Sequence, residues 1–312
     1  MSKCLICGSS DWLKYCDIEN KKYSVVICKC CSFVRLSPIP SSKELDIFYS
    51  NLYRKKYSGQ DIVSETVVAY EQLRANDVVR LVKPYFERRF SNVLDIGCSS
   101  GTLLKNISKL SEKPNLYGIE KNDNYRNFIL ENNLISKENL TNENIDDYYI
   151  GREQYFDFIS IVHVLEHLKS PDKTLESIRR LLKNDGILYV EVPNLDTPYN
   201  NLRKKYFAIY HLYYFSDITL RILLEKVGFK ILESGVVSET SVYFICKNNT
   251  TVKSVTCISQ EGVAGQYMRV VKALKYYEKR YPLLFAIKAT GKILEILGLK
   301  NFIKKILNNL NK

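Results

Sequence analysis

The stretch VLDIGCSSG, residues 93–101, decides the fold of this chain. A short, mainly apolar run leads into a loop that contains Gly97, and a helical pattern begins directly after Gly101. Gly97 permits a tight turn and a close approach to the backbone, and Gly101 opens the helix. In a parallel α/β sheet such a loop lies at the carboxyl edge, where ligands bind. The stretch therefore predicts a ligand-binding strand–loop–helix unit.

This loop is not the G-x-G-x-x-G signature of dinucleotide-binding proteins, because Ser99 stands at the place of the middle glycine. The next apolar run, residues 116–119, ends at Glu120, nineteen residues after Gly101. A carboxylate at this position can accept both hydroxyl hydrogens of a ribose. The loop and Glu120 together predict a site for a ribose-containing ligand that needs no phosphate cradle.

Apolar runs alternate with helical patterns along the middle of the chain, which predicts a parallel α/β sheet of seven strands. A helix is expected over residues 62–83, ahead of the first strand. The further expected elements are a strand over 156–162, a helix over 171–182, a turn at 184–186, a strand over 187–192 and a final strand pair over 230–234 and 242–246.

Six of the nine cysteines fall within the first 31 residues, and four of these six form two C-x2-C pairs. Two such pairs can surround one metal ion with four thiolates, in the closed tetrahedral geometry of a structural zinc site. The alternative is a degenerate knuckle, or cysteines that are merely buried. Cys16 and Cys30 have no paired partner and are interpreted as spectators. The predicted Zn²⁺ ligands are Cys4, Cys7, Cys28 and Cys31.

The net charge of +12 is concentrated at the C-terminal end of the chain. Residues 248–312 contain twelve Lys and Arg against three Glu, so the body carries only +3 and a nucleic-acid surface is not expected. Helices are predicted over residues 267–279 and 288–310, the second basic and amphipathic. Such a helix could lie on an anionic membrane surface, or pack on its own domain or on a partner subunit.

The start of the chain lacks a basic segment followed by an apolar run, and no window of about 18 uninterrupted apolar residues occurs. We therefore expect a cytoplasmic protein. The basic C-terminal helix could bring it to the inner face of the membrane.

Five motifs follow one another in an order and spacing that resembles class I S-adenosylmethionine-dependent methyltransferases. The C-x2-C pairs ahead of them and HLYYFS, residues 211–216, narrow the resemblance to zinc-knuckle methyltransferases of deoxysugar and surface-polysaccharide pathways. The resemblance covers roughly residues 4–247. The motifs are D-x-G-x-x-x-G at 95–101, Glu120, HVLEH at 163–167, LLKNDGIL at 181–188 and EVPN at 191–194.

The resemblance implies a Rossmann-like, seven-stranded methyltransferase sheet with S-adenosylmethionine across its strand ends. Glu120 would bind the ribose, and His163 would line the floor. The methionine portion would contact Asp95 and Gly97 beside Gly101, and the adenine would contact Asn144 or Asp146. The implied division of the chain is a zinc-binding knuckle at 1–40, a linker and helical cap at 41–90, the cofactor-binding core at 91–247 and a basic helical extension at 248–312.

Methyl transfer is an in-line displacement that needs an aligned acceptor and, for a hydroxyl or an acidic carbon, a base. His211 is the candidate base, because related enzymes place substrate-facing residues after the strand that ends at 193–194. Tyr210 and Tyr213 are further candidates. The alternative for His211 is a cap on the helix that begins near Ser216.

HVLEH also satisfies the H-x-x-E-H pattern of one zinc-peptidase group. That interpretation requires the motif on a helix, with a third ligand and an open metal position. Because the motif directly follows a predicted strand, we expect Glu166 and His167 to brace the loop that closes on the cofactor.

The expected acceptor is a small molecule, a nucleotide sugar or glycan precursor. C-methylating members of the resembled group carry a much larger C-terminal domain than the 65 residues beyond residue 247, so O-methylation is slightly preferred. The alternatives are methylation of RNA or of another small molecule, and a non-enzymatic zinc-dependent binding module. Assembly into an oligomer remains open.

Overall fold

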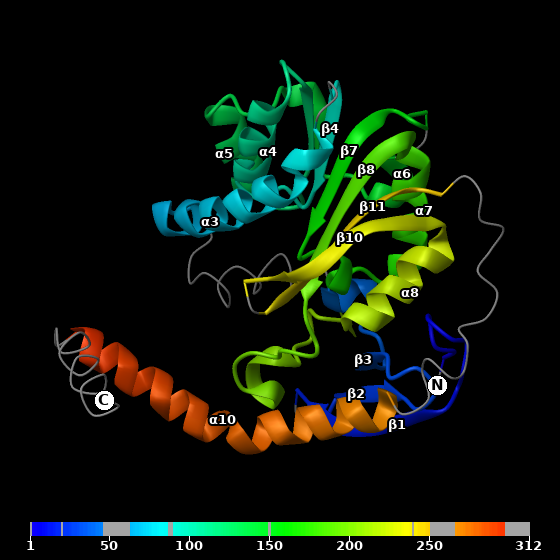
Figure 1. The fold of residues 1–312 in the computed structure, drawn as a ribbon, viewed down its shortest axis with the longest axis vertical. Coiled ribbons are helices and arrows are strands. Elements are labelled where there is room, and N and C mark those ends of the chain that lie inside the picture. The colour runs from blue at the N-terminus through cyan, green and yellow to red at the C-terminus, as the bar shows by residue number, and fades with distance from the viewer. Residues whose placement is uncertain are drawn as a thin grey trace.

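A computed structural model shows a central sheet flanked by helices, with a second, smaller sheet beside it and a long helix along that second sheet (Figure 1). The described residues are 2–19, 21–45, 63–86, 90–148, 151–238, 240–249 and 266–296.

The central sheet has seven strands in the order β10-β11-β8-β7-β4-β5-β6, which confirms the predicted Rossmann-like fold. β8, β7, β4, β5 and β6 run parallel, whereas β11 and β10 pair antiparallel at one edge. The strands are β4 (Asn92–Ile96), β5 (Asn115–Ile119), β6 (Leu140–Thr141), β7 (Phe156–Val162), β8 (Leu182–Pro193), β10 (Phe229–Val237) and β11 (Ser241–Asn248).

β4 lies at the centre of the sheet, between β5 and β7. From β4 the chain first proceeds outward through β5 and β6, and then crosses back to β7 and β8. The strand order thus reverses next to β4. In open α/β sheets, ligands bind outside the carboxyl ends of the strands at such a switch point. The topology therefore predicts a ligand site at the loops that follow β4, β5 and β7.

Helices cover both faces of this sheet, with α3, α4 and α5 on one face and α6, α7 and α8 on the other (Figure 1). These are α3 (Glu65–Val82), α4 (Thr102–Ile107), α5 (Asp123–Glu131), α6 (Ile145–Tyr148), α7 (Pro171–Leu181) and α8 (Asp217–Val227). Short helical turns occupy Lys83–Tyr85 (η1), Ser108–Leu110 (η2), Lys137–Asn139 (η3), Leu165–His167 (η4) and Leu202–Tyr206 (η5).

The N-terminal segment forms an antiparallel sheet of its own from β1 (Trp12–Ile18), β2 (Tyr23–Cys28) and β3 (Val34–Ser37). A fourth strand, β9 (Tyr213–Tyr214), pairs with β3 and comes from the segment that follows β8 of the central sheet. The ring of Phe33 also stacks on Tyr213 with 5.7 Å between centroids. The predicted boundary near residue 40 therefore separates two sequence segments that share one sheet.

Two expected element boundaries are wrong. The turn predicted at residues 184–186 lies within β8, which extends from Leu182 to Pro193. The two C-terminal helices are one, α10 (Gln266–Ile296), and the expected gap at residues 280–287 is helical although it contains Pro282. Pro282 is exposed, so a carbonyl that lacks its helical partner can bond water instead. The rest of the predicted second helix, residues 297–310, lies outside the described residues.

α10 lies along the N-terminal sheet and then extends away from the body (Figure 1). Glu278 anchors it, because its carboxylate accepts a hydrogen bond of 3.2 Å from the Tyr15 hydroxyl and pairs with Arg203. Within the described residues, no helix is long and apolar enough to cross a membrane.

Candidate functional site

The loop between β4 and α4 forms the centre of the candidate site, and its glycines are required by geometry. Gly97 has a φ of 75°, and a Cβ atom added there would collide with Cγ2 of Val164. Gly101 has a φ of 76° and is the N-cap of α4. Left-handed backbone at both positions favours glycine. The backbone at Gly97 thus approaches the loop after β7 more closely than any side chain would allow.

Glu120 follows β5 and ties two neighbouring loops together. Its carboxylate accepts hydrogen bonds from the Ser99 amide at 3.0 Å and from the Asn122 amide at 2.8 Å. Each carboxylate oxygen retains further lone pairs, so hydroxyl donors of a ligand can still bind. The structure therefore brings Glu120 to the loop of residues 97–101, as the sequence predicted.

Glu71 on α3 was not singled out from the sequence. Its carboxylate accepts hydrogen bonds from the hydroxyls of Ser99, at 2.6 Å, and of Ser100. These bonds fasten α3 over the loop at the carboxyl edge of β4. The sequence offers no signal for this contact, because a glutamate on an amphipathic helix ordinarily faces water.

Asp95, at the end of β4, is almost completely buried, and its Oδ1 accepts a hydrogen bond of 2.7 Å from the Ser160 hydroxyl. Burial raises the pKa of this carboxyl to about 7, with a further contribution from the charges of Glu71 and Glu120, despite the bond from Ser160. Among the residues that the structure describes, Asp95 has no cationic partner that would favour its ionised form.

The loop after β6 approaches Glu120 from the other side. Lys121 donates a hydrogen bond of 2.9 Å to Oδ1 of Asn144, so the Asn144 side chain lies beside the end of β5. The side chain of Asp146 lies outside the described residues, and its predicted role stays a prediction.

His163 is the first residue after β7 and turns the chain sharply, with a φ of 53°. Its Nε2 lies 3.0 Å from Oε1 of Glu191, on β8, and 3.1 Å from Oγ of Ser241, on β11. Burial and Arg74 oppose protonation, but the neighbouring carboxylates of Glu166 and Glu191 outweigh them and raise the pKa of His163. The side chain of His163 retains 21% of its surface exposed.

The other two histidines lie behind His163 in a buried cluster with Glu166. The rings of His167 and His211 have centroids 4.9 Å apart, and ligand atoms of the three residues lie within 4.8 Å of one another. Burial opposes ionisation of Glu166, but His167 and His163 lower its carboxyl pKa to about 2. Burial and the neighbouring His167 lower the pKa of His211 to about 3.

This arrangement does not support the peptidase interpretation of HVLEH. Glu166 and His167 lie in the single turn η4, and the residue that joins them is His211, not His163. His211 does not cap α8 either, because the Ser216 hydroxyl accepts a hydrogen bond from the Thr219 amide. The alternative role as a helix cap is therefore wrong.

The two tyrosines named as candidate bases are buried beside the N-terminal sheet. The hydroxyl of Tyr213 donates a hydrogen bond of 2.8 Å to the Lys169 carbonyl, which gives it a structural partner. The Tyr210 carbonyl accepts a hydrogen bond of 2.7 Å from Nδ1 of His167. Catalysis by Tyr210, Tyr213 or His211 stays a prediction.

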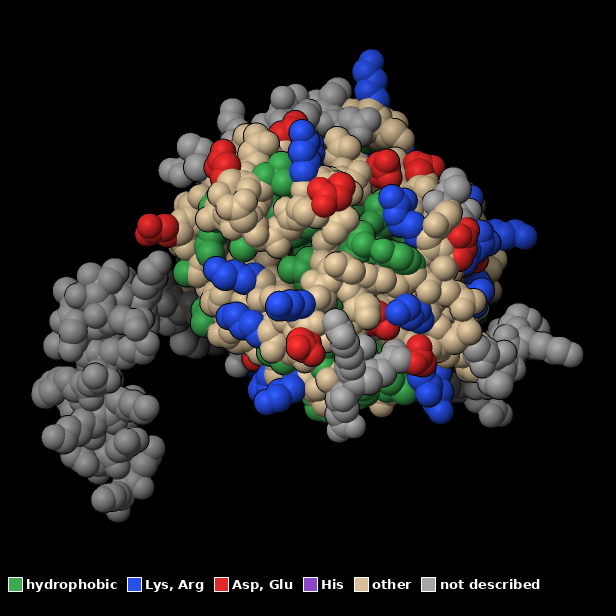
Figure 2. Space-filling view, turned by 90° about the horizontal axis from the view of Figure 1, so that it is seen from above, with side chains coloured by type: hydrophobic (Ala, Val, Ile, Leu, Met, Phe, Trp, Pro, Cys, Tyr) green, Lys and Arg blue, Asp and Glu red, His purple; other side chains and the backbone are tan. Residues whose placement is uncertain are grey.

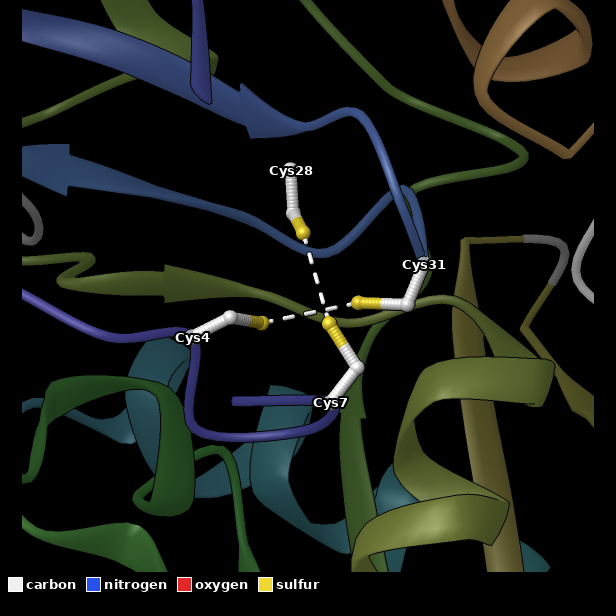
Figure 3. A group of neighbouring side chains, drawn as sticks. All are labelled: Cys4, Cys7, Cys28 and Cys31. Carbon is white, nitrogen blue, oxygen red and sulfur yellow. Dashed lines mark hydrogen bonds between the residues drawn. The ribbon is translucent and has the colours of Figure 1, made fainter. Parts of the chain in front are cut away.

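The four cysteines of the two C-x2-C pairs converge on one point (Figure 3). The sulfurs of Cys4 and Cys31 lie 3.5 Å apart, as do those of Cys7 and Cys28. Four ligands at about 2.3 Å from a tetrahedral zinc ion have sulfurs about 3.8 Å apart, close to this spacing. Cys16, within β1, and Cys30, which is exposed, lie outside the cluster.

The two pairs form equivalent turns. The Gly8 amide donates to the Cys4 carbonyl and the Ser32 amide to the Cys28 carbonyl, at 2.8 and 2.9 Å. Gly8 and Ser32 both have positive φ angles, 76° and 64°. The same local geometry at two distant points of the chain indicates a site built for one ligand set.

The sheet order and the glycine loop at its switch point define a Rossmann-like fold. A family model described as a methyltransferase domain matches residues 69–234, just over half of the chain. The chain therefore belongs to this family and carries a class I S-adenosylmethionine-dependent methyltransferase domain. Family membership disfavours the alternative of a non-enzymatic binding module.

Two solved structures share the fold at a TM-score of 0.51. The 1,6-didemethyltoxoflavin-N1-methyltransferase of Burkholderia thailandensis, bound to 1,6-didemethyltoxoflavin and S-adenosylhomocysteine, is 16% identical, and the likeness covers 73% of this chain and 96% of that one. The plantazolicin methyltransferase BamL, in complex with a triazolic desmethylPZN analog and S-adenosylhomocysteine, is 14% identical, and the likeness covers 66% of this chain and 95% of that one. At these identities the likeness shows the fold alone.

Among curated proteins, the tRNA U34 carboxymethyltransferase of Aliarcobacter butzleri is 27% identical over 51% of this chain and 54% of its own length. The ubiquinone biosynthesis O-methyltransferase of Glaesserella parasuis is 32% identical over 33% of this chain and 45% of its own length. The chain spans about half the length, or less, of these relatives. They differ in acceptor and do not identify the acceptor used here.

Proposed function

We propose that this enzyme methylates an oxygen of a sugar or sugar-derived group in polysaccharide or glycan biosynthesis. The pairing of β3 with β9 carries this proposal. This pairing brings the cysteine-rich segment and the HLYYFS segment into one sheet. These two segments are the features that narrowed the resemblance to sugar-pathway enzymes. That sheet adjoins the loop after β7, so its residues can contribute to an acceptor site.

The cofactor is proposed to lie across the carboxyl ends of β4 and β5. Glu120 would accept the ribose hydroxyls, since its carboxylate keeps lone pairs beyond those used by Ser99 and Asn122. Asp95 would pair with the ammonium group of the methionine portion, which supplies the cation that this buried carboxyl lacks. Asn144 or Asp146 is proposed to contact the adenine.

The methyl transfer itself needs one proton acceptor when the nucleophile is a hydroxyl. The acceptor oxygen forms a bond to the methyl carbon, the S–CH₃ bond breaks, and its electron pair remains on sulfur. The hydroxyl proton is assigned to His163. This histidine is accessible, and Glu191 stabilises its charged form.

His211 is the weaker candidate for this step, although the sequence favoured it. Only 2% of its surface is exposed, and a pKa near 3 makes its imidazole a poor proton acceptor at neutral pH. Because His211 is buried against His167, a structural role suits it better than contact with a substrate.

The four cysteines fit a structural zinc ion in donor type, spacing and turn geometry. Zn²⁺ bound by four thiolates would leave no position for a substrate, so its role would be to hold the N-terminal sheet in place. Cys4, Cys7, Cys28 and Cys31 are its proposed ligands.

Cofactor binding can be tested by titrating the full chain with S-adenosylmethionine and S-adenosylhomocysteine in a calorimeter. Glu120→Gln should weaken binding at least about tenfold, because an amide accepts fewer ribose hydrogen bonds. Glu131→Gln, on the exposed side of α5, is the matched control and should bind as the wild type does. Equal affinity in both variants would remove Glu120 from the ribose site.

The acceptor can be tested by transfer of a labelled methyl group to nucleotide sugars and to RNA in parallel. RNA is the second candidate because relatives include tRNA and rRNA enzymes. On the face shown in Figure 2, Lys and Arg are interspersed with Asp and Glu, which does not favour a polyanion. Methylation of RNA with a steep salt dependence, and none of sugars, would overturn the sugar proposal.

A further inference from the structure

The buried cluster behind His163 is built from two segments that are joined by two hydrogen bonds. Nδ1 of His167 donates a hydrogen bond of 2.7 Å to the Tyr210 carbonyl. The Leu212 amide donates one of 2.9 Å to the Glu166 carbonyl. The turn η4 and residues 210–212 are thus fixed against each other. The positions of the Glu166, His167 and His211 side chains are therefore set before any ligand binds.

The carboxylate of Glu166 is the unusual member of this cluster. The residue is 1% exposed, and neither of its carboxylate oxygens has a hydrogen-bond partner among the described residues. Oε1 lies 3.6 Å from Nδ1 of His163 and 3.7 Å from Nε2 of His167, beyond ordinary hydrogen-bond lengths. A carboxylate removed from water needs a partner in this space.

His167 presents a ring nitrogen with the orientation that a metal ligand has. A carbonyl can only accept, so the bond to Tyr210 places a proton on Nδ1 of His167 and directs Nε2 toward Glu166. Metal-ligating histidines usually donate their second ring N–H to a carbonyl or a carboxylate, which fixes the tautomer.

We propose that Glu166, His167 and His211 bind a divalent transition-metal ion, separate from the ion at the four cysteines. Their ligand atoms lie within 4.8 Å of one another. Donors at about 2.1 Å from a tetrahedral ion are about 3.4 Å apart, so the 3.7 Å between Oε1 and Nε2 of His167 needs only a small contraction. Two imidazoles and one carboxylate suit zinc, cobalt or iron.

The ion would act as a positioning element for His163. Glu166 lies between the proposed metal and Nδ1 of His163, so coordination would fix the carboxylate that faces this ring. This inference does not depend on the identity of the acceptor. A failure to methylate sugars would leave it unaffected.

The test is the metal content of the full chain, purified without chelator and measured by mass spectrometry of the elements. We expect two ions per wild-type chain, one in Glu166→Gln and one in His211→Gln. His163→Asn is the matched control and should retain two, because His163 is not among the proposed ligands and asparagine tolerates a positive φ. One ion in both the wild type and Glu166→Gln would overturn the proposal.

Cobalt substitution separates the two sites by their spectra. Four thiolates give intense charge-transfer absorption with Co²⁺, whereas nitrogen and oxygen ligands give only weak visible bands. We expect Glu166→Gln to lose the weak bands and keep the intense ones, while Glu166→Asp retains both. Circular dichroism of each variant shows whether it is folded, and a folded Glu166→Gln chain with an unchanged cobalt spectrum would contradict the second site.

Discussion

The four-cysteine site and the Glu166–His167–His211 cluster both bring ligand atoms together, but they differ in how the chain achieves this. In the cysteine site each half is a short local turn. Both turns have the same amide-to-carbonyl hydrogen bond and a residue with a positive φ angle. In the histidine cluster the partners come from segments 43 residues apart, joined by the bond between His167 and Tyr210. Local geometry leaves a spacing pattern in the sequence, whereas a contact made by packing does not.

The largest expected effect follows from removal of a cysteine ligand. Cys7→Ser should abolish zinc binding and lower the free energy of unfolding by about 5 kcal/mol or more, because metal binding supplies much of the folding energy of so small a module. Cys30→Ser, exposed and outside the cluster, should change stability by less than about 0.5 kcal/mol. Chemical denaturation with zinc analysis measures both. Similar stability in the two variants would show that the cysteines hold no structural ion.

His163 and His211 should differ in their contribution to catalysis. His163→Asn is expected to lower kcat by about 10²- to 10⁴-fold with little change in cofactor affinity, since only the proton acceptor is lost. In the wild type, kcat should rise with pH as His163 loses its proton. Steady-state kinetics across pH and calorimetry provide the two readouts. Loss of turnover in His211→Asn but not in His163→Asn would return the role of base to His211.

Asp95→Asn should weaken S-adenosylmethionine binding by about 10- to 100-fold, through loss of a charged partner for its ammonium group. The same variant should be more stable than the wild type at pH 8, by about 1–4 kcal/mol. Folding raises the carboxyl pKa to about 7, so the ionised form is disfavoured in the folded chain and the substitution removes that penalty. Calorimetry and thermal unfolding of the cofactor-free protein test the two effects.

The sign of this linkage also predicts a pH dependence. Because the folded pKa of Asp95 is raised, the carboxyl destabilises the wild-type fold progressively as pH rises from about 4 to about 7. Cofactor binding requires the ionised form, so affinity should fall about tenfold for each pH unit below 7. An affinity that does not change between pH 6 and pH 8 would exclude an ion pair at Asp95.

The smallest expected effect lies at the joint between the two sheets. Tyr213→Phe removes the hydrogen bond to the Lys169 carbonyl but keeps the ring against Phe33, so the free energy of unfolding should fall by only about 1 kcal/mol. Urea denaturation measures this change, and cofactor affinity should remain at the wild-type value. A large loss of turnover with intact stability would instead support a catalytic Tyr213.

Much of the cofactor edge could be predicted because it follows from chain continuity. A strand, a glycine loop and a helix occur in one stretch of sequence, and Glu120 ends the neighbouring strand. The role of Glu71 could not be predicted, since it depends on how α3 packs across the loop. The choice between His163 and His211 also depends on burial, which sequence position alone did not indicate.

By itself, the sequence determined the alternation that builds the sheet, the loop at residues 97–101 and the two cysteine turns, because each is specified by residues close together in the chain. Only the tertiary structure decided that β9 completes the N-terminal sheet and that Glu166 is enclosed by histidines. These contacts depend on the packing of segments that are distant in the sequence. Many residues of the shared hydrophobic core, rather than a short stretch of chain, stabilise them.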